Sequence, residues 1–402
     1  YSAAYLTLET DTPGLEGNGF VFTLGRGNDL ACDAIDLIAQ TLIGRDLGQL
    51  SKSMGALAQE LVRDSQVRWL GPEKGVTHMA TGAVLTAVWD LISKIAGKPL
   101  WKLLSDMSPE EIVELVDWRY LTDALTPAEA LEMLKKVQPN RAANEAKMLA
   151  EGLPAYTTTP GWLGYTDEKM VRLSKEAVAD GFTLIKLKCG ASLEDDKRRL
   201  RLAREAVGPN VKLAVDANQV WDVQEAIDWI NALGDVNLHW VEEPTNPDDV
   251  VGHAAIAKGI APVKVATGEA CANRVMFKQF LQLKGLSYMQ IDSARVGGVN
   301  ENVANVLLAA KFGIPVCPHA GGVGLCEMVQ HFAMFDAVAV SEHHDDRIIE
   351  YMDHLHEHMA VPTDVRNGRY FPPSKPGAGA EMLKASLADF TYPTGPQWKD
   401  FV

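Results

Sequence analysis

Two lysines lie two positions apart within the apolar stretch 183–189, which reads TLIKLKC. In a β-strand, side chains alternate between two faces, so Lys186 and Lys188 point one way while Ile185 and Leu187 point the other. Most lysines face water, and a solvated pair is the simplest explanation of this stretch taken alone. The alternative is that both amines face one reaction site, and the rest of the chain favours it.

Further polar residues follow apolar runs at a regular spacing. Each lies roughly 25 residues from the next, about the length of one strand–helix unit. Because the carboxyl ends of strands in a parallel barrel meet at one rim, we expect these side chains to converge there. The set is Lys188, Asp216, Glu242, Glu269, Asp292 and His319.

The three acids that follow Lys188 in this series predict a metal site. Asp216, Glu242 and Glu269 would raise one another's pKa values unless a cation lay among them. Oxygen ligands suit Mg²⁺ better than zinc or copper, which prefer His or Cys. Three unrelated surface acids are the alternative, but each acid closes an apolar run. Glu243 is expected to point to the other face.

The remaining members of the series predict acid–base chemistry. Asp292 and His319 can form a hydrogen bond that fixes the imidazole tautomer and raises the histidine pKa. Mg²⁺ and a second ammonium both disfavour positive charge, so we expect a lowered pKa for Lys188, which would act as general base. Lys186 is expected to stay protonated and to neutralise developing oxyanion charge.

The elements that carry these residues alternate along the chain. Short apolar runs such as VKLAVDAN, LHWVEEP and IPVCPH alternate with amphipathic segments such as DEKMVRLSKEAVADG. The alternation predicts an α/β fold with a parallel (β/α) barrel over 126–365, and a doubly wound sheet is the weaker alternative. Residues 1–125 predict an α+β capping domain that opens with a hairpin. The Pro- and Gly-rich segment 366–402 is expected to be irregular and to return to the cap.

Composition excludes several classes of partner. The net charge of −15 over 402 residues disfavours contact with nucleic acid and with anionic membranes. No apolar run approaches the roughly 18 residues of a membrane span. Five cysteines without a CxxC pair indicate a reducing intracellular compartment, cytoplasmic or mitochondrial. Because Tyr1 opens directly into a strand-like run, we expect an N-terminal piece, with any targeting peptide, to precede it.

The motifs resemble those of the enolase superfamily, in its mandelate racemase subgroup, over essentially the whole chain. The matches are the Lys-x-Lys of IKLKC, the Asp of VDAN, the first Glu of VEEP, the Glu of TGE, the Asp of QIDSARVGG and the His of CPHAGG. Stretches such as AYTTTPGWLGY, RVGGVNEN and EYMDHLHEH resemble the L-fuconate dehydratases of that subgroup. The resemblance implies a modified TIM barrel of the (β/α)7β type, and a first cap strand and a mobile specificity loop preceding Tyr1.

By that resemblance the chain is a Mg²⁺-dependent hydro-lyase that converts L-fuconate to 2-keto-3-deoxy-L-fuconate and water. The resemblance implies Lys188 as the base that takes the C2 proton, the three acids as Mg²⁺ ligands, and the Asp292–His319 dyad as the group that assists loss of the 3-hydroxyl. Candidate substrate-binding residues are Lys186, Asn218, Arg295, Glu350, Trp162 and Tyr165. The expected partner is a small acid sugar, and we expect a homo-oligomer.

Two alternatives remain. The same site could serve another sugar-acid dehydratase, or a racemase or epimerase. A barrel that has lost activity could serve as a regulatory protein, although such a barrel has no reason to keep both lysines and all three acids. A zinc site in the stretch with His343, His344, His354, His356 and His358 is disfavoured, because the spacing is irregular and the neighbours are acidic.

Overall fold

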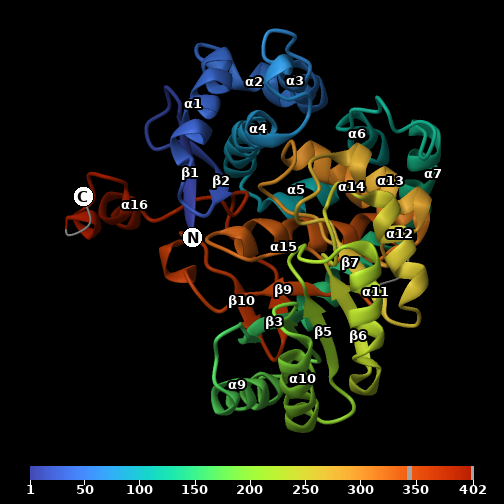
Figure 1. The fold of residues 1–402 in the computed structure, drawn as a ribbon. Coiled ribbons are helices and arrows are strands. Elements are labelled where there is room, and N and C mark those ends of the chain that lie inside the picture. The colour runs from blue at the N-terminus through green and yellow to red at the C-terminus, as the bar shows by residue number, and fades with distance from the viewer. Residues whose placement is uncertain (342–345, 400–402) are drawn as a thin grey trace.

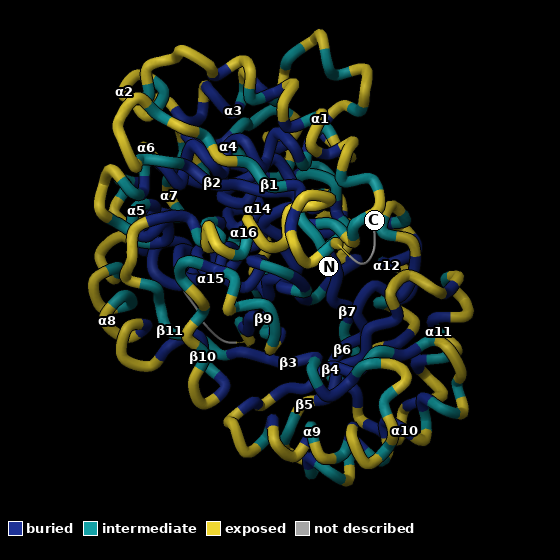
Figure 2. Tube along the Cα trace, turned by 90° about the vertical axis from the view of Figure 1, so that its left-hand side faces the viewer, coloured by how far each residue is buried: buried dark blue, intermediate teal, exposed yellow. Residues whose placement is uncertain are grey.

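The computed structural model describes residues 1–341 and 346–399 of the chain. In Figure 1 the N-terminal cap, drawn in blue, lies above a barrel of strands whose outer helices include those at the bottom of the view. In Figure 2 the strands are buried, while the outermost helices are partly exposed. Within the described ranges, no helix has the length and apolar character needed to cross a membrane.

The cap opens with an antiparallel hairpin of β1 (Ser2–Glu9) and β2 (Glu16–Thr23), which confirms the predicted hairpin. Helix α4 (Gly75–Ile95) packs on β2 at close range. This approach requires Gly17 and Gly19, because a Cβ at these positions would lie 2.2 and 2.1 Å from carbonyl oxygens of α4. The remaining helices before the barrel are α1 Asn28–Ala39, α2 Leu47–Leu50, α3 Met54–Val62, α5 Leu100–Asp106, α6 Pro109–Glu114, α7 Pro127–Val137 and α8 Arg141–Glu151.

Parallel strands form the barrel. They are β3 Leu153–Gly161, β4 Leu184–Lys188, β5 Lys212–Asp216, β6 Leu238–Glu242, β7 Lys264–Thr267, β8 Tyr288–Met289 and β9 Ile349–Tyr351. Neighbours from β3 to β8 pair in order, and β9 pairs with β3. Between β8 and β9, the Cys317 N–H donates to Met289 and the Glu350 N–H donates to Pro318. The ring is therefore closed, which confirms the barrel and excludes a doubly wound sheet.

Helices follow the strands and cover the outside of the barrel (Figures 1 and 2). They are α9 Asp167–Ala179, α10 Leu193–Val207, α11 Val223–Asn231, α12 Val250–Gly259, α13 Arg274–Leu283, α14 Val299–Phe312 and α15 Leu325–Phe335. The barrel interior is filled below the site by a separate apolar layer that includes Tyr156, Trp240 and Tyr288. Along each strand these residues share the face of the site residues, so the layer forms the floor of the site.

The C-terminal segment is less irregular than predicted. Strands β10 (Asp364–Arg366) and β11 (Arg369–Phe371) form a hairpin that extends the sheet beside β3, and α16 (Lys384–Phe390) follows. The segment does return to the cap, where the Met382 N–H donates to the Tyr5 hydroxyl at 3.1 Å. The hairpin spans the predicted boundary at 365/366, and the domain boundaries themselves stay a prediction.

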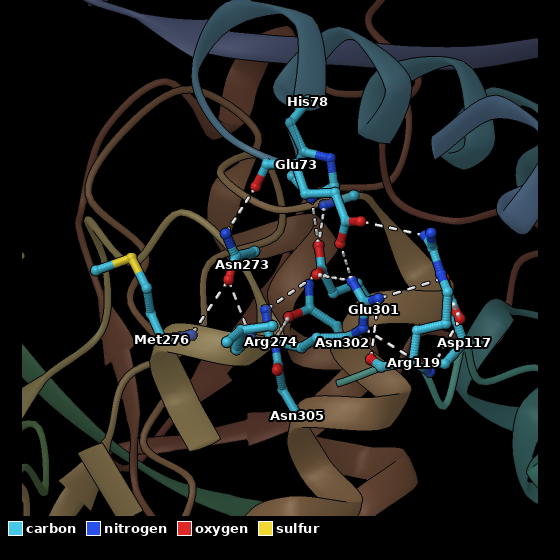
Figure 3. A network of polar contacts seen from close by, with 12 residues as sticks. Glu73, His78, Asp117, Arg119, Asn273, Arg274, Met276, Glu301, Asn302 and Asn305 are labelled. Atoms are coloured by element: carbon cyan, nitrogen blue, oxygen red, sulfur yellow. Dashed lines mark hydrogen bonds and ion pairs between the residues drawn. The ribbon is translucent and has the colours of Figure 1, made fainter. Parts of the chain in front are cut away.

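A buried polar network joins the cap to the barrel (Figure 3). The Arg274 guanidinium, on the first residue of α13, donates to Glu73 at 2.6 Å, to Asp117 at 3.2 Å and to Glu301 at 3.2 Å. Glu301, on the first turn of α14, also contacts His78 of α4 at 2.7 Å. One arginine thus holds two acids that precede the barrel and one acid on a barrel helix.

Candidate active site

Both lysines of β4 lie on the interior face of the barrel, as the alternation predicts. Ile185 and Leu187 point outward into the main apolar core. Lys186 is fully buried, with 1% of its side chain exposed, and Lys188 retains 16%. The solvated pair is therefore excluded.

The other residues of the series reach the same rim by different routes. Asp216 and Glu242 end strands β5 and β6, as predicted. Glu269 lies beyond the end of β7, after Gly268, whose φ of +140° turns the chain. Asp292 and His319 likewise follow β8 and the Cys317 segment in irregular backbone. All six residues thus lie at the carboxyl ends of the strands, although three of them follow a strand and do not belong to it.

The three acids converge closely enough to hold one ion. Each of Asp216, Glu242 and Glu269 offers an oxygen, and these atoms lie within 4.8 Å of one another, the one such cluster found in the described part of the chain. Burial, which Lys186 only partly offsets, raises the pKa of Glu242 to about 8, and Asp216 adds to the rise. The predicted mutual repulsion is thus present at Glu242. Glu243 lies outside the cluster and accepts a hydrogen bond from Gln219 at 2.9 Å.

Carboxylates surround both lysines and set the direction of their pKa shifts. Lys186 forms ion pairs with Glu242 and, at 2.9 Å, with Glu350. Burial by itself lowers the pKa of Lys186, but these carboxylates outweigh it and the pKa is raised. At Lys188, burial again lowers the pKa, but the contact with Asp216 outweighs both burial and Lys186. In the chain by itself the pKa of Lys188 is therefore raised, because the nearest charge is a carboxylate and not the second ammonium. The predicted lowering also invokes a bound Mg²⁺ and stays a prediction.

Asp292 and His319 form the predicted pair. His319 Nδ1 lies 2.7 Å from Asp292 Oδ2, and Nε2 lies 3.4 Å from Glu269 Oε2. Burial lowers the pKa of His319, but Glu269, Asp292 and Glu350 outweigh burial and raise it to about 10. The imidazole is therefore held in its protonated form at neutral pH, with Nδ1 fixed and Nε2 directed toward the cluster of acids.

Glu350 enters the site from β9, as the resemblance implied. Its carboxylate accepts hydrogen bonds from the Thr158 hydroxyl at 2.8 Å and from the Ala320 N–H at 3.1 Å. Burial raises its pKa, but Lys186 and His319 outweigh burial and hold the pKa below its usual value. Glu350 therefore lies between the lysine side and the histidine side of the site.

Gln290 is a site residue that the sequence analysis missed. It is fully buried, and its amide nitrogen donates to Glu242 Oε2 at 2.7 Å. Because Lys186 contacts the other oxygen of Glu242, the carboxylate is fixed from both sides. Gln290 is two positions from both Tyr288 and Asp292, so in an extended segment its side chain points to the same inner face. This alternation was the sequence signal that could have identified Gln290.

The structure brings together only some of the predicted substrate-binding residues. The Trp162 ring lies 5.5 Å from Lys188 Nζ, at the lysine side of the site. The Tyr165 ring instead lies 3.5 Å from Lys169 of α9. Asn218 is exposed, and only its backbone N–H contacts Asp216, at 2.9 Å. Arg295 approaches Met79 of the cap at 3.9 Å and pairs with no carboxylate of the described residues.

The described histidines of the stretch 343–358 do not gather around one point. His356 contacts Glu327 at 2.6 Å, whereas His358 contacts Ser386 at 3.0 Å and His354 stacks on Tyr1. His343 and His344 lie outside the described residues. The described members of this stretch thus have separate partners.

Comparison with known proteins identifies the family. The chain matches the N-terminal domain of mandelate racemase and muconate lactonizing enzyme over residues 1–105, and the enolase C-terminal domain-like family over residues 169–386. The chain belongs to the enolase superfamily, in its mandelate racemase subgroup, and the resemblance of its motifs is confirmed.

Relatives in this family extend the comparison to whole chains. The crystal structure of human mitochondrial enolase superfamily member 1 is 49% identical, covers 100% of this chain and 92% of its own, and superposes with a TM-score of 0.98. An L-galactonate dehydratase of Hypocrea jecorina is 47% identical over 99% of this chain and 89% of its own. An L-talarate dehydratase of Polaromonas, crystallised with Mg and L-glucarate, is 25% identical, with a TM-score of 0.71 over 96% of this chain and 90% of its own.

Proposed function

We propose that this chain is a Mg²⁺-dependent acid-sugar dehydratase acting on L-fuconate or on its close structural relative L-galactonate. The observation that carries the proposal is the placement of an amine, a cluster of three carboxylates and a protonated imidazole on one barrel rim. This arrangement supplies a base, a metal site and an acid to a single small substrate. The dehydratases among the relatives support the same class of reaction.

The donor set fits Mg²⁺. Asp216, Glu242 and Glu269 offer only oxygen ligands, which is the preference of a hard divalent cation. Burial raises the pKa of Glu242 to about 8, and the neighbouring carboxylates of Asp216, Glu350 and Glu269 add to the rise, so a bound cation would stabilise its ionised form. A bound Mg²⁺ would supply Lewis-acid stabilisation of the charge that develops on the substrate carboxylate when the C2 proton leaves.

Lys188 is the group best placed to take the C2 proton. Its ammonium pairs with Asp216, and a cation held by Asp216 would compete for that carboxylate. The pKa of Lys188 would then fall, because burial and Lys186 both disfavour its charged form. Lys186, fully buried between Glu242 and Glu350, keeps its proton and balances negative charge near the reacting carboxylate.

His319 is the group best placed to give a proton to the leaving hydroxyl. Asp292 holds Nδ1, so the proton on Nε2 is the one available to the substrate. The C3–O bond breaks as the 3-hydroxyl takes this proton and departs as water, and the electrons from the C2–H bond form the C2–C3 double bond. The resulting enol tautomerises to the 2-keto-3-deoxy acid.

The substrate proposal rests on configuration. L-Fuconate is the 6-deoxy form of L-galactonate, so the two acids share their configuration from C2 to C5 and differ only at C6. A site that hydrogen-bonds the 6-hydroxyl rejects the deoxy acid by a factor of about 10⁴, whereas an apolar pocket excludes the added hydroxyl by only about 10². The ratio of kcat/KM for the two acids therefore tells which kind of pocket receives C6, and Arg295 and Asn218 are the polar candidates.

Proton exchange in D₂O tests the assigned roles. We expect Lys188→Ala to lose exchange of the substrate C2 hydrogen together with dehydration, and His319→Asn to retain exchange while losing dehydration. Identical behaviour of the two variants would show that base and acid are wrongly assigned. An epimerised acid as the product would identify the racemase or epimerase alternative, and a wild-type chain without exchange or turnover on a panel of sugar acids would favour the inactive homologue.

The compartment remains part of the proposal. All five cysteines are free thiols and four are buried, which fits a reducing interior. We propose an intracellular enzyme, cytoplasmic or mitochondrial.

A further inference from the structure

The loop that follows His319 contains a glycine directly beside the imidazole. A Cβ built on Gly321 would lie 2.6 Å from His319 Nε2, 3.2 Å from Cε1 and 3.7 Å from Cδ2. Because the contact is shortest to Nε2, such a methyl group would lie on the outer edge of the ring, where the N–H points. The missing side chain of Gly321 therefore leaves open the space that a proton acceptor must enter.

The imidazole has no freedom to move away from that space. Asp292 holds Nδ1 at 2.7 Å on the opposite edge of the ring. The Asp292 carboxylate is itself fixed by the Ala294 N–H at 2.6 Å, and Asn302 donates to the Asp292 carbonyl at 3.1 Å. A group added beside Nε2 would have to break this chain of contacts to displace the ring.

The loop is equally confined on its other side. A Cβ on Gly322 would lie 2.1 Å from the Phe22 ring, and one on Gly324 would lie 2.7 Å from the Phe20 ring, both on strand β2 of the cap. The loop is thus pressed between the cap hairpin and His319. The Phe20 and Phe22 rings therefore limit how far the loop can shift toward the cap if residue 321 gains a side chain.

We propose that Gly321 is a positioning residue for proton donation, because its lack of a side chain keeps the proton-bearing edge of His319 open to the departing 3-hydroxyl. This inference rests on the proposed function and deepens it. The three atoms nearest to a Cβ at 321 all belong to His319, so we expect proton abstraction by Lys188 not to depend on Gly321. A methyl group at 321 would press on the proton-donating edge of His319, so it should impair proton donation and leave proton abstraction by Lys188 intact.

Gly321→Ala tests the proposal, with L-fuconate and L-galactonate as substrates and Mg²⁺ present. The backbone of Gly321 does not lie in the left-handed region, so alanine meets a steric problem only at the ring. We expect dehydration to fall by about 10² or more, the usual contribution of a general acid. Exchange of the C2 hydrogen with D₂O should stay within threefold of the wild-type rate, as in His319→Asn. The matched control is Gly234→Ala, whose Cβ would meet nothing within 4 Å and which should leave both rates unchanged.

Two outcomes of this experiment overturn the proposal. One is a Gly321→Ala variant that dehydrates at the wild-type rate, and the other is a folded variant in which exchange and dehydration fall together. If urea unfolding shows that the alanine variant does not fold, Gly321→Ala combined with Phe22→Leu gives the loop room behind it, and the same split between exchange and dehydration must then appear. Failure of the wild-type chain to dehydrate either acid refutes the proposed function itself, which is a different result.

Discussion

Arg274 offers the sharpest test of how the cap is held on the barrel. Its side chain is 3% exposed and donates to three carboxylates, on Glu73, Asp117 and Glu301. Arg274→Met keeps an unbranched apolar stem and removes every guanidinium donor, which leaves those acids without their common cation. Breaking a buried ion pair by removal of one partner costs about 3–5 kcal/mol. We therefore expect the free energy of unfolding of Arg274→Met to fall by about that amount.

The pKa of Glu301 gives an independent magnitude and a pH dependence. Burial raises this pKa, but His78 and Arg274 outweigh burial and lower it from 4.5 to about 2. A shift of that size corresponds to about 3 kcal/mol of stabilisation of the ionised form. Because the folded-state pKa is depressed, this contribution is present above about pH 4.5 and is lost as the pH falls toward 2. Loss of Arg274 raises the pKa of Glu301, so acid unfolding of the variant should begin at a higher pH.

Urea unfolding followed by tryptophan fluorescence provides the assay. Arg198→Met is the control, because Arg198 forms exposed pairs with Asp167 and Asp195 and should leave the midpoint unchanged. Adding Glu301→Gln to Arg274→Met removes one of the orphaned charges, so the double variant should lose less than the sum of the two single losses. A loss below about 1 kcal/mol for Arg274→Met, or strict additivity in the double variant, would refute this account of the network.

Three further predictions concern titration and metal affinity. Gln290→Leu removes the donor that fixes Glu242 and should weaken Mg²⁺ binding about tenfold or more by calorimetry, and an unchanged affinity would contradict the role of Gln290. Because the pKa of Glu242 is raised to about 8, Mg²⁺ binding at pH 7 should release protons and tighten as the pH rises toward 8; heats of binding that are equal in buffers of different ionisation enthalpy would contradict this. Both ring nitrogens of His356 face acceptors, Glu327 Oε1 at 2.6 Å and the Met352 carbonyl at 2.7 Å, so the ring is an imidazolium. Burial lowers its pKa, but Glu327 outweighs burial and raises it, so this stabilisation is complete below about pH 6.5 and is lost as the pH rises through the folded-state pKa. In the wild-type chain the urea midpoint should therefore decline as the pH rises above about 6.5, and this decline should be absent in His356→Gln.

The local sequence pattern predicts to which face of a strand each side chain points, and this was enough to identify most residues of the candidate active site. The period of two placed Lys186 and Lys188 on one face, and the spacing of the strand–helix units placed the acids and His319 on one rim. The run IPVCPH shows the limit of the same reasoning, because it is strand-like in composition yet forms only an isolated bridge at Val316. Pro315 and Pro318 interrupt it, and neither has an N–H to donate to a neighbouring strand.

Contacts between segments far apart in the chain were beyond prediction from local pattern. Glu73 and Arg274 meet across 201 positions, and no periodicity in either segment indicates that they pair. The packing of Gly322 and Gly324 against the Phe22 and Phe20 rings of the cap strand β2 is another such contact. The motifs were enough to identify the family, but these long-range contacts depend on how the segments pack in three dimensions.

The charge balance of the rim explains both the raised pKa of Lys188 in the chain by itself and the need for a divalent cation. Five carboxylates gather there, from Asp216, Glu242, Glu269, Asp292 and Glu350, and they face three cationic groups, Lys186, Lys188 and protonated His319. With all five ionised, the difference is two negative charges, and protonation of Glu242, whose pKa is raised to about 8, reduces it to one at pH 7. The surrounding acids outweigh burial at each cation, so its pKa is raised rather than lowered. A single divalent cation bound by the three clustered acids would remove this excess. Lys188 would then share its partner Asp216 with the ion, whereas Lys186 would keep Glu350, so Lys188 is the lysine positioned to give up its proton and act as a base.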